Sequence, residues 1–286
     1  MQVIKTTEQM REYIKQQHNE TIGFVPTMGY LHEGHISLLK EASKVSKIVV
    51  TSIFINPLQF NNPDDLKNYP QNLDRDTAIC GKAGVDVVFI PTVEEIYGNS
   101  YPPEISISAN QLSQHLCGAT RPGHFDGVCM VVTKLLNIVT PTQIFLGKKD
   151  IQQLRIIETM IDNFSLPTKV IACDTIRTPQ GLALSSRNSR LNSEEQRQAL
   201  IIPKILQHIA SLIDNGNINA EKLIAAGKCL IEDINNNLQL DYLEIVDYNN
   251  LQPVGAIHGK VIIAIAMFIG KTRLIDNIIF NPRKSS

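Results

Sequence analysis

The sequence predicts an α/β protein: a doubly wound, Rossmann-like parallel sheet followed by a second, smaller α+β domain. Over the first 175 residues, short apolar runs alternate with amphipathic stretches, as in consecutive βαβ units. Residues 176–286 instead carry helical patterns followed by strand-like runs. A length of 286 residues exceeds what one hydrophobic core usually fills. We therefore expect two domains, residues 1–175 for nucleotide and substrate binding and residues 176–286 covering the active site.

The expected elements of the first domain follow in chain order. Residues 22–25 form a short apolar run that should end at Pro26, which lacks an N–H. Apolar residues recur every three positions over 35–46 with charges opposite, which predicts a half-buried helix. The nearly continuous β-branched run 48–55 predicts a strand covered on both faces. Further helices are expected over 73–82, 128–139 and 150–164, and strands over 85–90, 144–146 and 168–173.

The second domain should begin after a Ser-, Arg- and Gly-rich stretch at 174–190. Ser193 and Gln196 form a capping-box signal for a helix, which Pro203 should kink or delay. A second helix is expected over 221–235, followed by strands over 242–246 and 260–268.

Charge and cysteine usage exclude several classes of protein. With 27 Lys and Arg against 28 Asp and Glu, the chain lacks the positive field of a general nucleic-acid or membrane-surface binder. The five cysteines are scattered, which is typical of a reducing compartment. The first ten residues carry no secretory apolar segment, and the longest apolar run, 261–269, is far shorter than the ~20 residues of a membrane span. We expect a cytoplasmic protein with neither nucleic-acid nor membrane partners.

The most informative segment is 26–35, PTMGYLHEGH, which follows the first apolar strand. Ligands of doubly wound sheets bind at the carboxyl ends of the strands. A helix begins at the end of this segment, so backbone N–H groups and the positive helix end would face an anion. Gly29 and Gly34 let the backbone approach closely, and His32 and His35 can donate to phosphate oxygens.

Three interpretations of this segment are open. A metal site through His32 and His35 is one, although the zinc-protease pattern needs two residues between Glu and the second His. A capping loop with two surface histidines is another. The third, which we favour, is a phosphate-binding turn.

The same string resembles the HxGH signature of the nucleotidylyltransferase and class I synthetase superfamily, and as a whole it resembles the pantoate–β-alanine ligase family. Further segments resemble other motifs of that family, in the same order along essentially the whole chain: 52–60, 65–70, 121–125, 150–154 and 182–188. Together these motifs are far more specific than HxGH alone.

The resemblance implies a two-step ligase. ATP is the co-substrate, with Mg²⁺ bridging its phosphates mostly through water and phosphate oxygens. The pantoate carboxylate attacks the α-phosphorus and releases pyrophosphate, and the β-alanine amine then attacks the acyl carbon of pantoyl adenylate, releasing AMP and pantothenate. A homodimer is expected from the resemblance alone.

The resemblance also implies which residues act. Catalysis of a reaction between two negative groups needs positive electrostatics and positioning, expected from His32, His35, Lys149 and Arg187. Lys149 and Arg187 could instead be ordinary solvated charges, and Ser185 and Ser186 could be turn or capping residues. The whole expected ATP-binding set is Met28, Gly29, Tyr30, Leu31, His32, Glu33, Gly34, His35, Gly147, Lys148, Lys149, Asp150, Ile176, Leu184, Ser185, Ser186 and Arg187.

Pantoate offers hydroxyls and a carboxylate, so its pocket needs uncharged donors and acceptors. The expected substrate-binding residues are Gln59, Gln153, Asn56 and Arg121, of which Asn56 could equally be a strand-end turn former. Apolar walls could come from Pro26, Met28 and Phe60, with Tyr69 as a further candidate. No magnesium ligand is assigned, although Asp76 is possible.

One position departs from the family pattern. Residues 147–150 read GKKD where the family usually has GEKD, so Lys148 replaces an acid beside the expected phosphate site. Lys148 could point to solvent or add to phosphate attraction.

Three other functions compete with the ligase. A nucleotidyl transferase would need basic residues in place of Gln59 and Gln153. An aminoacyl-tRNA synthetase would need a larger RNA-reading module and a basic face. An inactive nucleotide-binding protein would not be expected to keep both histidines, Lys149, Arg187 and both glutamines.

Overall fold

A computed structural model describes residues 1–17, 19–98, 101–232 and 238–282. The chain forms two compact units, each described below by itself. The first unit comprises residues 1–109, 121–148 and 153–176, and the second comprises 110–120, 149–152 and 177–286. The two short inserts, 110–120 and 149–152, lie in the sequence range assigned above to the first domain.

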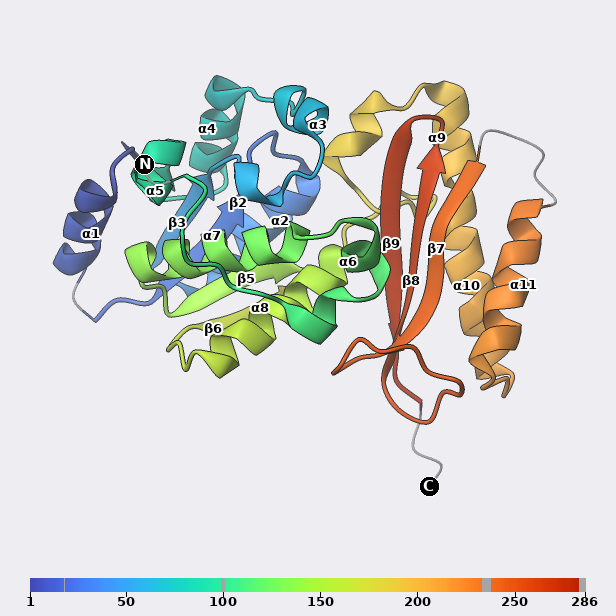
Figure 1. Ribbon diagram of the computed structural model, residues 1–286. Helices are drawn as coiled ribbons and strands as arrows, with labels where there is room; N and C mark the ends of the chain where they lie inside the picture. Colours follow the sequence, from blue (N-terminus) through green and yellow to red (C-terminus); the bar gives the residue numbers. More distant parts are fainter. Residues whose placement is uncertain (18, 99–100, 233–237, 283–286) are drawn as a thin grey trace. The chain divides into compact units, whose positions relative to one another are not determined.

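The first unit is built on a parallel six-stranded sheet with the order β1-β4-β3-β2-β5-β6. This confirms the predicted doubly wound class. Strands β2, β3, β5 and β6 of this sheet are labelled in Figure 1. The chain moves outward from β2 through β3 to β4, then returns to β5 on the other side of β2 and continues to β6. The carboxyl ends of β2 and β5 therefore mark the switch point of the sheet, where ligands bind in this class of fold. The strands are β1 (Gln2–Ile4), β2 (Ile22–Thr27), β3 (Ile48–Ile53), β4 (Val87–Phe89), β5 (Gln143–Gly147) and β6 (Lys169–Cys173).

Helices cover the sheet of this unit. Leu39 and Ala42 of α2 and Cys80 of α4 pack with strand residues such as Val25 and Val49 in one buried cluster. These are apolar residues at helical spacing, as expected for a helix with one buried face. The helices of the unit are α1 (Thr7–Gln16), α2 (Glu33–Val45), α3 (Pro63–Lys67), α4 (Leu73–Lys82), α5 (Val93–Tyr97), α7 (His124–Val139) and α8 (Ile151–Asn163), with the 3₁₀ turn η1 (Pro57–Gln59); the first residues of α8 cluster with the second unit.

Several boundaries differ from the sequence prediction. Strand β2 does not stop at Pro26 but continues to Thr27. It pairs with β5 only at Gly23 and Phe24, so Pro26 lies beyond the paired residues on that side, where a missing N–H is tolerated. Helix α7 begins at His124, four residues early, with Gly123 (φ +77°) as its N-cap. Strand β1 and helix α1 were not predicted.

The second unit contains an antiparallel sheet with the order β7-β8-β9. Helix α10 packs its buried face, including Ile205 and Ile209, in one core with β8 residues such as Ile263 and Ile265. Its elements are η2 (Asn110–Ser113), α6 (Leu116–Thr120), η3 (Lys148–Asp150), η4 (Ser186–Arg190), α9 (Ser193–Ala199), α10 (Ile201–Asp214), α11 (Ala220–Glu232), β7 (Leu238–Asp247), β8 (Val261–Ile269) and β9 (Thr272–Phe280); Lys148 itself clusters with the first unit.

The predictions for this region hold in outline. The helix before Pro203 is interrupted at Leu200, as expected from proline. The capping box is formed by Asn192 and Glu195, so the prediction from Ser193 was wrong by one residue. Residues 233–235 of the second predicted helix lie outside the described residues. Strand β9 was not predicted, and it proves important for the loops described next.

Candidate active site

The segment after β2, residues 28–35, is called the histidine loop here. Its backbone adopts positive φ at Gly29 (+83°) and Tyr30 (+51°). The second value is uncommon for a residue with a side chain, so the surrounding structure has to stabilise it. That stabilisation comes from helix α4.

Asp76 of α4 holds the histidine loop by its backbone. Its two carboxylate oxygens accept the N–H groups of Tyr30 (2.6 Å) and Leu31 (2.8 Å), and its side chain is 1% exposed. The neighbouring Arg75 donates from Nη2 to the Leu31 carbonyl at 2.9 Å and places its guanidinium 5.4 Å from the Tyr30 ring centroid. A carboxylate that accepts backbone N–H groups makes strong, charge-assisted hydrogen bonds.

This arrangement changes the interpretation of Asp76. The sequence left it as a possible magnesium ligand, but both of its oxygens are engaged by the loop backbone. Across the described part of the chain, no group of three or more His, Cys, Asp or Glu residues could hold a metal ion. The described residues thus offer no protein cage for Mg²⁺, and among them the metal interpretation of His32 and His35 has no further ligand to complete it.

The two histidines cap helix α2 reciprocally. His32 is the N-cap, and its Nδ1 accepts the N–H of Gly34 at 3.1 Å, while Nδ1 of His35 accepts the N–H of His32 at 3.3 Å. Their ring centroids are 4.1 Å apart. A nitrogen that accepts cannot carry a proton, so each neutral ring has its proton on Nε2. Both imidazoles are thereby fixed as Nε2–H donors at a helix N-terminus.

Gly34 is required by this cap. A Cβ at that position would lie 2.8 Å from Cε1 and 2.9 Å from Nδ1 of His32, closer than a real contact allows. Any side chain between the two histidines would displace the His32 ring. The glycine of HxGH is therefore needed because the His32 ring lies close to the backbone at position 34.

Gln59 lies beside the start of the histidine loop. It follows β3 in η1, is 9% exposed, and its Nε2 lies 3.3 Å from Sδ of Met28. Its carbonyl accepts from Nδ1 of His124 at 2.7 Å and from Nη2 of Arg121 at 3.3 Å. Within the first unit, the structure thus places Gln59, a predicted substrate-binding residue, beside Met28, a predicted ATP-binding residue.

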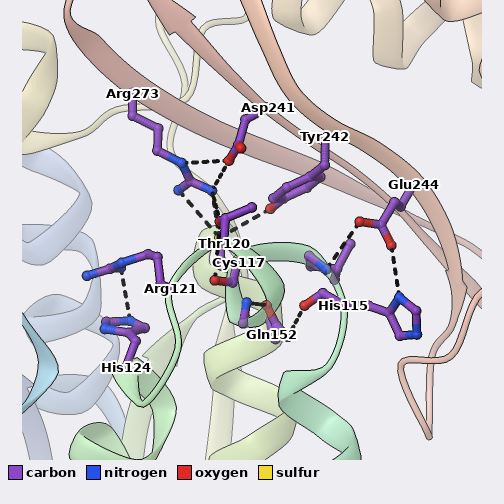
Figure 2. Close-up of polar contacts among 12 residues, drawn as sticks. His115, Cys117, Thr120, Arg121, His124, Gln152, Asp241, Tyr242, Glu244 and Arg273 are labelled. Atoms are coloured by element: carbon purple, nitrogen blue, oxygen red, sulfur yellow. Dashed lines mark hydrogen bonds and ion pairs between the residues drawn. The ribbon is translucent and has the colours of Figure 1, made fainter. Parts of the chain in front are cut away.

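Asn56 and Arg121 support Gln59. Asn56 is 1% exposed and caps η1 by accepting the N–H of Leu58, so the turn-forming alternative is the one that the geometry favours. Figure 2 shows the contact of Arg121 with His124, Nη1 to Nε2 at 3.0 Å. Because the guanidinium can only donate, Nε2 of His124 accepts and Nδ1–H donates to the Gln59 carbonyl.

The chain after β5 carries two lysines with different partners. Lys148, at the position of the family's acid, lies 2.6 Å from Oδ1 of Asp174, which follows β6. That ion pair was not among the two roles considered for Lys148. Lys149 has Nζ 3.7 Å from Asp150 and a side chain that is 17% exposed.

Strand β9 ties two of the predicted phosphate segments together within the second unit. Asn277 donates from Nδ2 to the carbonyl of Lys149 at 2.8 Å. Arg177 makes a bidentate pair with the buried Asp276, at 2.5 and 2.8 Å, and also donates to the Asn277 carbonyl. Residues 184–190 are called the serine–arginine loop here. Arg177 lies at the base of the segment that leads to this loop.

The serine–arginine loop is capped from within. Ser185 caps η4 by accepting the N–H of Arg187, and Asn188 donates to the carbonyl of Ala183. The capping role considered for Ser185 is thus observed, while Arg187 lies half-buried in η4.

A further polar cluster surrounds α6 in the second unit (Figure 2). Gln152 accepts the N–H of Gly118 and donates to the carbonyls of Leu112 and His115. Tyr242 of β7 lies 3.2 Å from Sγ of Cys117, and burial is the largest cause that raises its pKa. These contacts fix α6 and the start of α8, where Gln153 follows directly.

Sequence reasoning missed three residues that hold the predicted site segments: His124 in the first unit, and Arg177 and Asn277 in the second. His124 lies in a motif that was noted, but its role depends on the carbonyl of Gln59, 65 residues away. The others carry no local signal in the sequence.

None of the described helices is long and apolar enough to cross a membrane.

Comparison with known proteins decides the family. The family model for pantoate–beta-alanine ligase matches residues 2–279. The chain belongs to the pantoate–β-alanine ligase family. It is a ligase that forms pantothenate in an ATP-dependent reaction.

Relatives of this ligase are similar over their full length. A pantothenate synthetase of Fervidobacterium nodosum is 46% identical over 98% of this chain and 100% of its own length, and one of Clostridium botulinum is 43% identical over 98% and 99%. The crystal structure of the Thermus thermophilus pantothenate synthetase matches with a TM-score of 0.90 at 35% identity, covering 97% of this chain and 99% of that chain. The Francisella tularensis ligase, solved in complex with beta-gamma ATP and beta-alanine, matches with a TM-score of 0.80 at 36% identity, covering 98% and 97%.

Proposed function

We propose that this ligase activates the pantoate carboxylate as an adenylate at the histidine loop and then transfers the pantoyl group to β-alanine. The observation that carries the proposal is the pair of imidazoles that cap α2, with Gln59 beside Met28. A helix N-terminus with two fixed donors suits phosphate, and a neutral amide suits a carboxylate substrate that a nearby acid would repel.

In the first step a pantoate carboxylate oxygen attacks the α-phosphorus of ATP, and the bond to pyrophosphate breaks. Two negative groups approach each other, so catalysis depends on positioning and on donors aimed at phosphate oxygens. We assign that role to Nε2–H of His32 and His35, together with the cations of Lys149 and Arg187. Ser185 and Ser186 are proposed as further contacts for ATP.

In the second step the β-alanine amine attacks the acyl carbon of pantoyl adenylate. The C–N bond of pantothenate forms, the acyl C–O bond breaks, AMP leaves, and the amine loses its proton to solvent. Gln59 and Gln153 are proposed to bind the hydroxyl and carboxylate oxygens of pantoate. Asn56 and Arg121 are assigned to the support of Gln59.

The ion, the assembly and the location belong to the same proposal. Mg²⁺ is expected to accompany ATP, and among the described residues no group of three or more His, Cys, Asp or Glu could hold it. A homodimer is expected from the family, and a cytoplasmic location is expected from the scattered cysteines. Sedimentation as a monomer at micromolar concentration would contradict the dimer.

The test is an assay of pyrophosphate and AMP release from Mg·ATP, omitting one acid at a time. With pantoate alone, pyrophosphate release should reach about one equivalent per active site and then stop, while AMP stays bound as adenylate. Turnover with AMP release should require β-alanine as well. Sustained pyrophosphate release without pantoate, or AMP release from ATP and β-alanine alone, would contradict the two-step assignment.

A further inference from the structure

Tyr97, a residue without an assigned role, lies at the far end of a buried hydrogen-bond chain that ends on Gln59. Its hydroxyl donates to Oδ1 of Asn56 at 2.7 Å, and Nδ2 of Asn56 donates to Oε1 of Gln59 at 3.0 Å. Tyr97 is 7% exposed, Asn56 1% and Gln59 9%. All three belong to the first unit.

The direction of this chain is fixed by its members. Oδ1 of Asn56 receives two donors, the Tyr97 hydroxyl and the N–H of Leu58 (3.3 Å), while Nδ2 also faces the carbonyl of Gly127 at 3.0 Å. Flipping the Asn56 amide would set donors against donors and an acceptor against a carbonyl. Asn56 must therefore present Nδ2 to Gln59.

The fixed orientation of Asn56 in turn decides which way the Gln59 amide points. Since Oε1 accepts from Asn56, the Nε2 group is turned away from Asn56 and toward Met28 of the histidine loop. We propose that Tyr97, acting through Asn56, sets the orientation of the Gln59 amide so that it offers a donor to the acid substrate. This rests on the proposed assignment of Gln59 to pantoate.

The orientation matters because pantoate binds as an anion. A Gln59 amide in the opposite orientation would place Oε1 toward the carboxylate and hydroxyl oxygens, where two acceptors would repel. A donor that is fixed before binding also avoids the cost of ordering the side chain on binding.

Tyr97 is itself well held for this task. It ends α5, and its ring packs against those of Phe54 and Tyr101, with centroids 6.2 and 5.8 Å away, while Nζ of Lys134 lies 5.8 Å from the ring. A tyrosine hydroxyl is protonated at neutral pH at its ordinary pKa near 10, and burial raises the pKa of Tyr97 further, so the hydroxyl is available as a donor.

The experiment is a double-mutant cycle of Tyr97→Phe and Gln59→Ala, read as KM for pantoate and KM for ATP. Tyr97→Phe keeps the ring and removes one hydrogen bond, so KM for pantoate should rise about three- to tenfold while KM for ATP stays within about twofold. In the Gln59→Ala background the same change should add almost nothing. Tyr101→Phe is the matched control, because Tyr101 touches the Tyr97 ring and is 45% exposed, and it should behave as the wild type.

The outcomes separate this inference from the proposed function. If Gln59→Ala leaves KM for pantoate unchanged, the proposed pocket is wrong. If Gln59→Ala raises it but Tyr97→Phe does not, or if the two effects multiply in the double variant, Tyr97 does not act through Gln59. Equal rises in both KM values with a lowered melting temperature would mean a structural role only, and would overturn the inference too.

Discussion

The histidine loop and the serine–arginine loop carry the two halves of the proposed phosphate chemistry, but they are held in different ways. In the histidine loop, a buried carboxylate accepts two consecutive backbone N–H groups, and both histidine rings are engaged in the helix cap. In the serine–arginine loop, the strong contact lies at the base, where Arg177 pairs with Asp276, and Ser185 caps the turn within the loop.

The two loops therefore differ in where along their length they are fixed by contacts. The histidine loop is fixed along its length, so its donors are in place before a nucleotide arrives. The serine–arginine loop is anchored most strongly at its base, and Ser189 and Arg190 are exposed. A disturbance of the first should lower the rate of catalysis strongly, and a disturbance at the base of the second should lower stability with little loss of catalysis. The predictions below test this contrast.

The largest effect is expected for His35→Ala and Lys149→Ala. Each should lower the rate of pantoate-dependent pyrophosphate release by about 10²- to 10³-fold, the usual effect of removing one donor to a charge that develops in the transition state. Burst amplitude and steady-state release measure it. His258→Ala, at an exposed position of the second unit, is the control. A variant with wild-type turnover would remove that residue from the phosphate-stabilising set.

Asp76→Asn should come next. The amide keeps one acceptor but points an NH₂ group at a backbone N–H, so the positive-φ segment loses one of its two hydrogen bonds. We expect pyrophosphate release to fall about 10- to 100-fold, since small misplacements of catalytic groups are costly, with a loss of about 1–3 kcal/mol in unfolding free energy. Asp74→Asn, at an exposed position in the same first turn of α4, is the matched control. Unchanged catalysis in a destabilised Asp76→Asn variant would break the contrast.

Arg177→Ala should lower stability more than it impairs catalysis. It leaves the carboxylate of Asp276, 1% exposed, without its bidentate partner, which should lower the unfolding free energy of the second unit by about 2–4 kcal/mol. KM for ATP should rise less than tenfold. Urea unfolding followed beside steady-state kinetics measures both. Arg197→Ala breaks an exposed pair with Glu194 and should cost less than about 0.5 kcal/mol.

Lys148→Ala should have a small effect. The lysine pairs with Asp174, whose side chain is 86% exposed, and such surface pairs contribute about 0–1 kcal/mol. We expect turnover within about twofold of wild type. A tenfold loss of adenylation in this variant would show that Lys148 attracts the phosphates instead.

The thiols should report whether the core beneath the histidine loop stays closed. Burial, with Asp76 as a further cause, raises the pKa of Cys80 to about 12, and burial raises that of Cys129 to about 12 and of Cys173 to about 11. These groups stay protonated at pH 8, so a thiolate-selective reagent should modify only the exposed Cys229 rapidly. As pH rises above about 8.5, the unfolded thiols ionise before the folded ones, so stability should fall. Faster labelling of Cys80 in the Asp76→Asn variant would show that helix α4 opens locally when the hydrogen bonds of Asp76 are weakened.

Much of the fold was predictable because its signals are local. Helix α4 was predicted with its observed bounds, since apolar spacing and flanking turns mark it. Strand β1 was missed because three residues at a sheet edge, two of them exposed, carry no period. Strand β9 was missed because its polar residues, such as Asp276 and Asn277, are buried against partners far along the chain.

By itself, the sequence determined the doubly wound class, the position of the histidine loop after β2 and the chemistry of the donors, because periodicity, glycine and residue type are local properties of the chain. Only the tertiary structure shows that Asp76 accepts two backbone N–H groups, that Asn56 donates to Gln59, and that the Tyr97 hydroxyl donates to Asn56. The physical reason is that a polar side chain acquires its role from the partner that satisfies it when it is buried. Those partners lie tens of residues away, and only folding brings them within hydrogen-bond distance.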